Sequence, residues 1–109
     1  MATTYKVLAQ SAPSATTATD IYTVPSATQT VISSIVVANR AATSATYRIA
    51  VRPNGASLAN QHYVAYDVTV GASDSTTITL GITVDAADVL TVYASTANLS
   101  FNVFGSEIA

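Results

Sequence analysis

The segment Thr76-Thr-Ile-Thr-Leu-Gly-Ile-Thr-Val84 alternates apolar and hydroxyl side chains along most of its length. A period of two is typical of a β-strand that is buried on one face and exposed on the other. Gly81 interrupts the hydroxyl face and marks a candidate bulge or close backbone approach. The pattern predicts one half-buried strand, with a core face formed by Ile78, Leu80, Ile82 and Val84.

Two further segments with this alternation flank a strong turn signal. In 46–52, apolar residues such as Tyr47 alternate with arginine and alanine. The sequence Arg52-Pro-Asn-Gly55 then ends the strand, because Pro fixes φ and Asn-Gly tolerates positive φ. The alternation resumes in 62–70, so we expect a hairpin with a long loop. The second segment would face inward with Val64, Tyr66, Val68 and Val70, and outward with Tyr63, Ala65, Asp67 and Thr69.

The remainder of the chain is also rich in strand-forming residues. It contains 17 Thr, 13 Val and 7 Ile residues, which are β-branched and fit a pleated surface. Segment 30–39 is apolar on both faces. Val31, Ile35 and Val37 are expected on one face, and Ile32, Val36 and Ala38 on the other. Such a strand is central in the core or lies under a subunit interface. Further strands are expected at 5–10, 21–24, 88–96 and 99–104.

These segments predict one domain that spans residues 1–109. Their number and spacing are typical of two packed sheets. The small-residue segment 11–20 is expected to be an extended connector inside that domain. We therefore predict an all-β fold, an antiparallel β-sandwich of about eight strands. Its connectivity is open between jelly-roll-like and immunoglobulin-like.

The chain carries unusually little charge. Lys and Arg number 4 and Asp and Glu number 6, so 9% of the residues are charged, and the net charge is −2. An average domain has about 25% charged residues. Nothing basic is available to neutralise phosphates or to hold an anionic membrane, so we expect neither nucleic acid nor membrane as a partner. A surface this neutral is suited to being covered by copies of the chain or by other proteins.

The residues that usually carry chemistry are sparse. Cysteine is absent, and His62 is the single histidine, which we interpret as a hydrogen-bonding residue at a strand edge. Asp85 and Asp88 resemble half of a calcium site, but the turn between two strands favours local backbone capping. We therefore expect no catalytic, cofactor or metal site, and a protein that is not an enzyme. The N-terminal segment lacks a secretion signal, which predicts synthesis in the cytoplasm.

The best candidates for function are contact residues. Three arginines lie within a short stretch, and two of them share a strand face with an aspartate expected on the neighbouring strand. They would form either surface ion pairs or contacts with a neighbouring subunit, because a guanidinium suits carboxylates and carbonyls. The exposed tyrosine of the second strand would pack at an interface or stack on a sugar. The candidate subunit contacts are Arg40, Arg48, Arg52, Tyr63 and Asp67.

Seven stretches together form a recognisable pattern: Ile21–Pro25, Val37–Arg40, Tyr47–Pro53, Gln61–Asp67, Leu80–Thr83, Asp88–Ser95 and Leu99–Glu107. Across nearly the whole chain, this pattern resembles small virion structural proteins of tailed bacteriophages, of the cyanophage and marine-phage type. The family has no catalytic residues to transfer. The resemblance implies a structural role on the particle, either in the head, neck, tail or fibre.

With this resemblance, the composition leads to a specific expectation. We expect a homo-oligomeric accessory subunit that decorates or cements the capsid or tail and contacts major capsid or tail proteins. It would be assembled in the host cytoplasm and located in the virion. The alternative is a receptor- or glycan-binding module of a tail tip or fibre, which would need exposed aromatic side chains.

Overall fold

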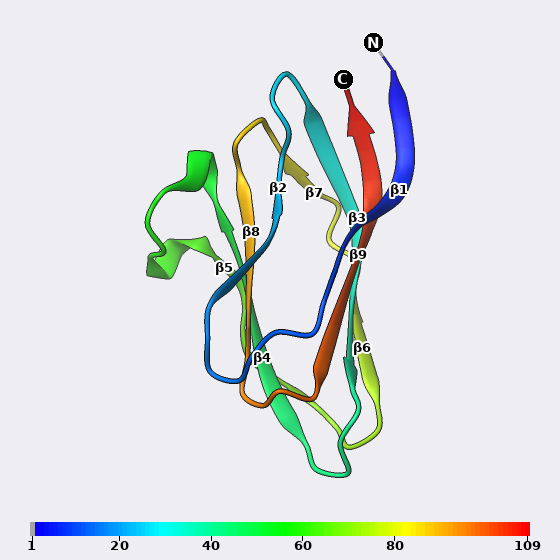
Figure 1. Cartoon of the computed structure of the whole chain (residues 1–109), viewed down its shortest axis with the longest axis vertical. Coiled ribbons are helices and arrows are strands. Elements are labelled where there is room, and N and C mark those ends of the chain that lie inside the picture. The colour runs from blue at the N-terminus through cyan, green and yellow to red at the C-terminus, as the bar shows by residue number, and fades with distance from the viewer. Residues whose placement is uncertain (1) are drawn as a thin grey trace.

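A computed structural model describes residues 2–109, which form two antiparallel β-sheets packed face to face (Figure 1). This confirms the predicted all-β sandwich. The strands are β1 (Thr3–Ser11), β2 (Thr19–Thr23), β3 (Gln29–Asn39), β4 (Ala45–Arg52), β5 (Tyr63–Val70), β6 (Ser75–Ile78), β7 (Ile82–Val84), β8 (Val89–Ala94) and β9 (Leu99–Ile108). Two single 3-10 turns, η1 (Pro53–Gly55) and η2 (Asn60–His62), connect β4 to β5. Within residues 2–109, no helix is long and apolar enough to cross a membrane.

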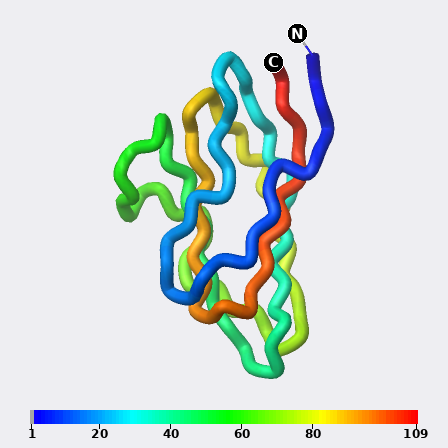
Figure 2. Tube along the Cα trace, viewed as in Figure 1, coloured from blue at the N-terminus to red at the C-terminus, as the bar shows by residue number. Residues whose placement is uncertain are grey.

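The strands pair in a nested order. The first sheet has the order β1-β9-β3-β6, with β7 also paired to β3, and the second has the order β2-β8-β4-β5. The first strand therefore pairs with the last, β2 pairs with β8, β3 pairs with β6 and β7, and β4 pairs with β5. Figure 2 shows the two ends of the trace side by side, where Ala2 and Ala109 exchange backbone hydrogen bonds. The segment between Ser11 and Thr19 has no strand, close to the expected connector.

The core lies between the two sheets and is built from alternate residues of the central strands. Tyr47 of β4 and Phe101 of β9 meet edge to face with their ring centroids 6.1 Å apart, which joins the two sheets. The inward faces predicted for 46–52, 88–96 and 99–104 are confirmed. Fully buried apolar residues include Ile35, Val37, Tyr47, Ile49, Leu90, Val92, Ala94, Leu99, Phe101 and Val103.

The segment 76–84 is not one strand, so that prediction is wrong. β6 ends at Ile78, and β7 begins at Ile82. Gly81 between them has φ of +61°, a conformation that turns the chain out of the sheet. Ile78, Ile82 and Val84 still pack against the core, but Leu80 is 59% exposed. The two short strands act as one interrupted edge strand along β3.

The predicted faces of β5 are wrong for the part before Asp67, because the strand contains a bulge, whereas Val70 after it is buried as predicted. Asp67 has φ of +51°, and the pairing with β4 skips a residue there: Tyr47 pairs with Val68 and Ile49 with Ala65. The extra residue inverts the alternation of the preceding part of the strand. Tyr66 is therefore 56% exposed, whereas Tyr47 is buried as predicted.

A second bulge regroups the apolar residues of β3. The pairing with β9 skips Ser33, between Ile32 and Ser34. Ile32 is consequently buried on the same side as Ile35 and Val37, in contrast to the predicted grouping. The expectation that β3 is central and apolar on both faces holds, because Val31, Val36 and Ala38 are half-buried on the other side.

Candidate functional site

Charged and aromatic side chains gather on the outer face of the second sheet. Arg48 alternates with the buried Tyr47 and Ile49 and therefore points away from the core. Tyr93 of β8 lies opposite Arg48 in register. The bulge in β5 brings two more side chains to Arg48 from the other side. We name this group the arginine–tyrosine cluster; it consists of Arg48, Tyr66, Asp67 and Tyr93.

Arg48 is the centre of the arginine–tyrosine cluster. Its guanidinium carbon lies 4.2 Å from the ring centroid of Tyr66 and 4.3 Å from that of Tyr93. Both distances are within the range of cation–π attraction. Its Nε donates a hydrogen bond of 2.7 Å to Oδ1 of Asp67, and this bond raises the pKa of Arg48. The cation is therefore held by an aromatic ring on each side and by a carboxylate.

Tyr63, which the sequence pattern predicted to be exposed, is not the most exposed tyrosine of β5. Tyr63 is half-buried, and its ring meets that of Tyr66 edge to face at a centroid distance of 4.9 Å. Tyr66 presents 56% of its surface to solvent. The sequence pattern did not predict that Tyr66 and Tyr93 belong to the site. The bulge at Asp67 exposes Tyr66, and no glycine or proline in the sequence marks its position.

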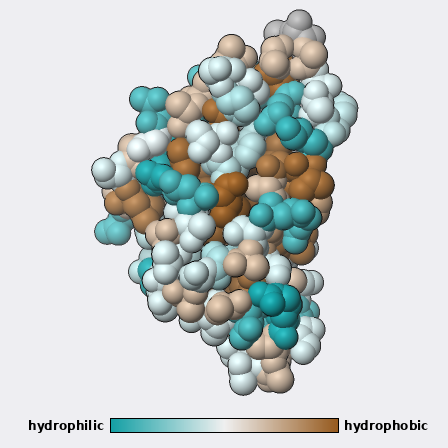
Figure 3. Space-filling model, viewed as in Figure 1, coloured by the Kyte–Doolittle hydropathy of each residue, from teal (hydrophilic) through white to brown (hydrophobic). Residues whose placement is uncertain are grey.

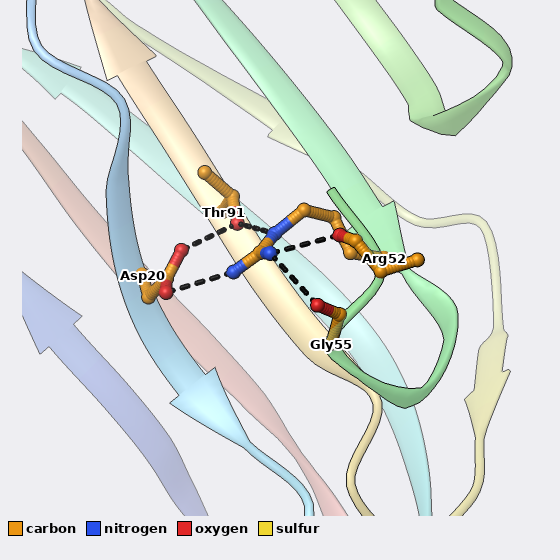
Figure 4. Close-up of polar contacts among 5 residues, drawn as sticks. Asp20, Arg52, Gly55 and Thr91 are labelled. Atoms are coloured by element: carbon orange, nitrogen blue, oxygen red, sulfur yellow. Dashed lines mark hydrogen bonds and ion pairs between the residues drawn. The ribbon is translucent and has the colours of Figure 1, made fainter. Parts of the chain in front are cut away.

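Arg52 forms a separate network at the end of β4 (Figure 4). Its Nη2 donates to Oδ2 of Asp20 at 2.8 Å, and its Nε donates to Oγ1 of Thr91 at 3.0 Å. Its Nη1 donates to the carbonyl oxygens of Gly55 at 3.3 Å and Ala56 at 2.9 Å. All three guanidinium nitrogens thus have acceptors inside the chain. Arg52 joins β2, β8 and the turn after β4.

Arg40 lies apart from both groups. It follows β3, in the first sheet, and its Nε donates to Oγ of Ser100 at 2.8 Å. Its Nη2 donates to the carbonyl oxygen of Ala97 at 3.0 Å. Of the predicted contact residues, the structure brings together Arg48, Tyr63 and Asp67 by direct contacts or through Tyr66. It places Arg52 further along the same strand and Arg40 at the end of the other sheet.

The polar residues considered for catalysis or metal binding have local roles. The Nδ1 atom of His62 accepts the N–H of Ala59 at 3.1 Å. The carboxylate of Asp88 accepts the N–H groups of Asn54 and Asp85, both at 2.8 Å, which is the capping role that the sequence favoured. Within residues 2–109, no three His, Asp or Glu side chains are grouped closely enough to hold a metal ion.

A second polar group lies between the sheets near the chain ends, where no local pattern in the sequence predicted one. The hydroxyl of Tyr22 bonds with Oγ1 of Thr30 at 2.8 Å and donates to Glu107. Glu107 also pairs with Nζ of Lys6 at 3.0 Å. Burial and the bond to Glu107 raise the pKa of Tyr22 to about 12, and the bonds from Tyr22 and Lys6 lower the pKa of Glu107. Only the pairing of β1 with β9 and the packing of β2 bring these residues together.

The same end of the sandwich has an open depression of about 360 Å³, lined mainly by aliphatic and hydroxyl side chains of β3, β7 and β9 together with Asp85 and Asp88. It lies away from the arginine–tyrosine cluster, whose exposed ring and held cation are suited to contact with another surface. Comparison of the chain with family models, with curated proteins and with solved structures finds no match.

Proposed function

We propose that the protein is a non-enzymatic structural subunit of a bacteriophage virion. It acts as an oligomeric accessory subunit that decorates or cements the capsid or tail and contacts the major capsid or tail proteins. The observation that carries this proposal is the near-neutral exterior. Only ten side chains are charged, and six of them pair with one another, which leaves few charges to repel a neighbour.

Most of the few cationic side chains form ion pairs with carboxylates of the same chain. Within residues 2–109, three of the four Lys and Arg side chains form ion pairs: Lys6 with Glu107 at 3.0 Å, Arg48 with Asp67 at 2.7 Å and Arg52 with Asp20 at 2.8 Å. In Figure 3, large pale areas of intermediate hydropathy separate smaller teal and brown areas. Such a surface supports close packing beside many copies, because it has little long-range field.

The connectivity is a second support. We infer that the sandwich is a jelly roll, because the nested pairs β1–β9, β2–β8, β3–β6/β7 and β4–β5 are those of one long hairpin rolled over itself. Counting β6 and β7 as one interrupted strand gives four strands in each sheet. Jelly rolls are frequent in viral capsid proteins and in lectins. A fold hosts many functions, so this support is an analogy and is weaker than the surface argument.

Quantitative mass spectrometry of purified virions tests the proposal. We expect peptides of this chain in a fixed ratio to the major capsid or tail protein, retained through gradient purification and a high-salt wash. A host cytosolic protein measured in the same fractions is the control for carry-over. Absence from the washed particle, or a ratio that varies between preparations, would overturn the proposal.

A receptor- or glycan-binding module is the second candidate, and Tyr66 is the observation that favours it. Its ring is 56% exposed and lies beside a cation, so it offers apolar ring surface and a phenolic hydroxyl to a ligand. A glycan array with the wild type and with Tyr66→Ala tests this candidate, and Leu80→Ala, which removes an exposed apolar side chain from the edge of the other sheet, is the matched control. Binding that is lost only in Tyr66→Ala would support it. No glycan bound by the wild type would remove it.

A further inference from the structure

The sandwich has four sheet edges, and three of them carry features that block the addition of another strand. β2 has five residues, a register shift and the charge of Asp20. β5 has two register shifts and Asp67. The edge of the first sheet that β6 and β7 form along β3 is interrupted at Gly81. Short length, bulges and charges are the usual ways in which proteins protect sheet edges.

β1 is the exception, as Figure 1 shows at the side of the first sheet. It has nine residues, and the run from Thr3 to Val7 is exposed throughout. The first irregularity in its pairing comes after Val7. Its charged residue, Lys6, is paired with Glu107. A long, regular and exposed edge is a template for pairing with another strand.

The backbone groups that are free on this edge can be assigned. Ala2 and Ala109 exchange both of their N–H···O bonds, at 2.9 Å each, so Ala2 directs its backbone groups toward β9. Because the direction alternates along an antiparallel strand, Thr4 and Lys6 also face β9. The N–H and C=O groups of the odd-numbered residues therefore face away from the sheet: those of Thr3, Tyr5 and Val7.

We propose that β1 pairs with β1 of a second copy of this chain, antiparallel and about a twofold axis at Tyr5. Tyr5 then pairs with Tyr5 of the second copy, and Thr3 pairs with Val7 on either side. All three outward N–H groups of each copy find a carbonyl in this register. The two first sheets merge into one continuous sheet across the axis.

Charge and side chains select this register and this occupant. An axis at Tyr5 places Lys6 opposite Thr4 of the second copy, whereas an axis at Lys6 would place two lysines opposite each other. Tyr5 and Val7 are 84% and 48% exposed, and on pairing each covers apolar surface of the other copy. The same strand is thus complementary to itself, as a twofold interface requires.

A proline at the axis tests the pairing by solution mass. Among residues 2–109 the N–H of Tyr5 has no partner, so Tyr5→Pro is compatible with an edge strand and removes both central bonds of the dimer. We expect the wild type at millimolar concentration to sediment at twice 11.2 kDa and Tyr5→Pro to sediment at 11.2 kDa with an unchanged circular dichroism spectrum, which shows that the variant is folded. A wild type at 11.2 kDa, or a variant that remains dimeric, would overturn the proposal and leave the edge to a strand of another protein.

Disulfide trapping tests the register, because the chain contains no cysteine of its own. Residues in a hydrogen-bonded pair have Cα atoms about 5.5 Å apart, within the range of a disulfide. Tyr5→Cys should therefore crosslink to itself under mild oxidation. Val7→Cys should not, since its two copies would lie about 14 Å apart, but it should crosslink when mixed with Thr3→Cys. Self-crosslinking of Val7→Cys with none of Tyr5→Cys would contradict the register.

This inference specifies the interface of the proposed oligomer. It rests on the proposed function only in assuming that the chain is oligomeric. The two can fail separately. A chain that dimerises through β1 but is absent from washed virions would refute the virion role alone. A chain present on virions that fails to crosslink at Tyr5, either in solution or on the particle, would refute the pairing alone.

Discussion

At Gly105, the backbone of β9 passes so close to β3 that no side chain fits. A Cβ atom there would overlap the carbonyl oxygen of Val31 and touch the side chain of Leu8. The bulges of β1 and β3 lie close to this point, since the two register shifts fall on either side of Phe104. Glycine is therefore required here by space, not by backbone conformation.

We predict that Gly105→Ala lowers the free energy of unfolding by about 3 kcal/mol, because rigid backbone must move to admit the methyl group. Urea denaturation followed by circular dichroism measures this change. Gly71→Ala is the matched control, since a Cβ there meets Asp74 only at an ordinary 3.7 Å. Equal losses in the two variants would show that the close approach at Gly105 is absent.

The pair of Tyr22 and Glu107 predicts a dependence of stability on pH. The pKa of Glu107 is lowered in the fold, so its contribution is present above the pKa of the unfolded chain and is lost as the pH falls through the folded value. The pKa of Tyr22 is raised to about 12, so its contribution is full below about pH 10 and is lost as the pH rises toward 12.

The difference in unfolding free energy between wild type and Glu107→Gln separates the contribution of Glu107 at low pH from the titration of the other carboxylates. We expect this difference to be constant from neutral pH to about pH 5 and to shrink below about pH 4. Urea denaturation at a series of pH values measures it. A difference that stays constant to pH 3 would mean that Glu107 titrates alike in the folded and unfolded chain.

The element after β4 shows how one side chain holds a turn. The sequence predicted the turn at Pro53–Gly55, and the structure places both Asn54 and Gly55 at positive φ. The turn bends back so that its carbonyls meet Arg52, whose side chain is 15% exposed. Removing the guanidinium leaves the buried Thr91 hydroxyl and two carbonyls with fewer partners.

We therefore predict that Arg52→Met, which keeps the aliphatic stem, costs about 2 kcal/mol of stability. It should also make the loop between β4 and β5 sensitive to thermolysin, which cleaves beside residues such as Leu58. Arg40→Met is the matched control, because Arg40 is exposed, and its loss should cost less than about 1 kcal/mol. Thermal melts and timed proteolysis measure both effects. Unchanged cleavage of Arg52→Met would show that the turn holds without the arginine.

The interrupted edge strand gives a contrast between two neighbouring apolar residues. Ile78 pairs with the buried Ile35 and packs against the core, whereas Leu80 is 59% exposed. We predict that Ile78→Asp costs at least about 3 kcal/mol or prevents folding, because it brings a carboxylate to apolar surroundings. Leu80→Asp should change stability by less than about 0.5 kcal/mol. Thermal unfolding of both variants measures this. A similar loss of stability in both would indicate that Leu80 is buried and that the strand continues through Gly81.

Sequence alternation was sufficient wherever a strand is regular. It predicted the inward faces of β4, β8 and β9 and the all-β class. It failed at Asp67 and Ser33, where one extra residue inverts the pattern and no glycine or proline marks the place. The ion pair of Arg48 with Asp67 was one of two alternatives left open by the sequence. Its two aromatic neighbours depended on the bulge and on the register between β4 and β8, which local pattern does not contain.

At the scale of the molecule, the contacts that define the fold join distant parts of the chain. Lys6 meets Glu107, and Ala2 pairs with Ala109, because the first strand pairs with the last. A local pattern predicts that strands exist, but it leaves their partners open, which is why two sandwich types remained possible from sequence. The same nested pairing leaves β1 at an edge of the first sheet. Its exposure is therefore a consequence of the whole topology.

Together with the proposed virion role, the distribution of charge leads to a prediction about docking onto the particle. The three ion-paired cations have their counter-charges inside the chain, and Arg40 bonds to Ser100 and to the carbonyl of Ala97. Attachment should depend on apolar contact and hydrogen bonds, which salt screens little. We predict that the Kd for particles stripped of this protein changes less than about threefold between roughly 0.05 and 0.5 M NaCl. Co-sedimentation with stripped particles measures it, with Arg40→Ala as the matched variant. A tenfold weakening that Arg40→Ala removes would instead make Arg40 the charged contact with the particle.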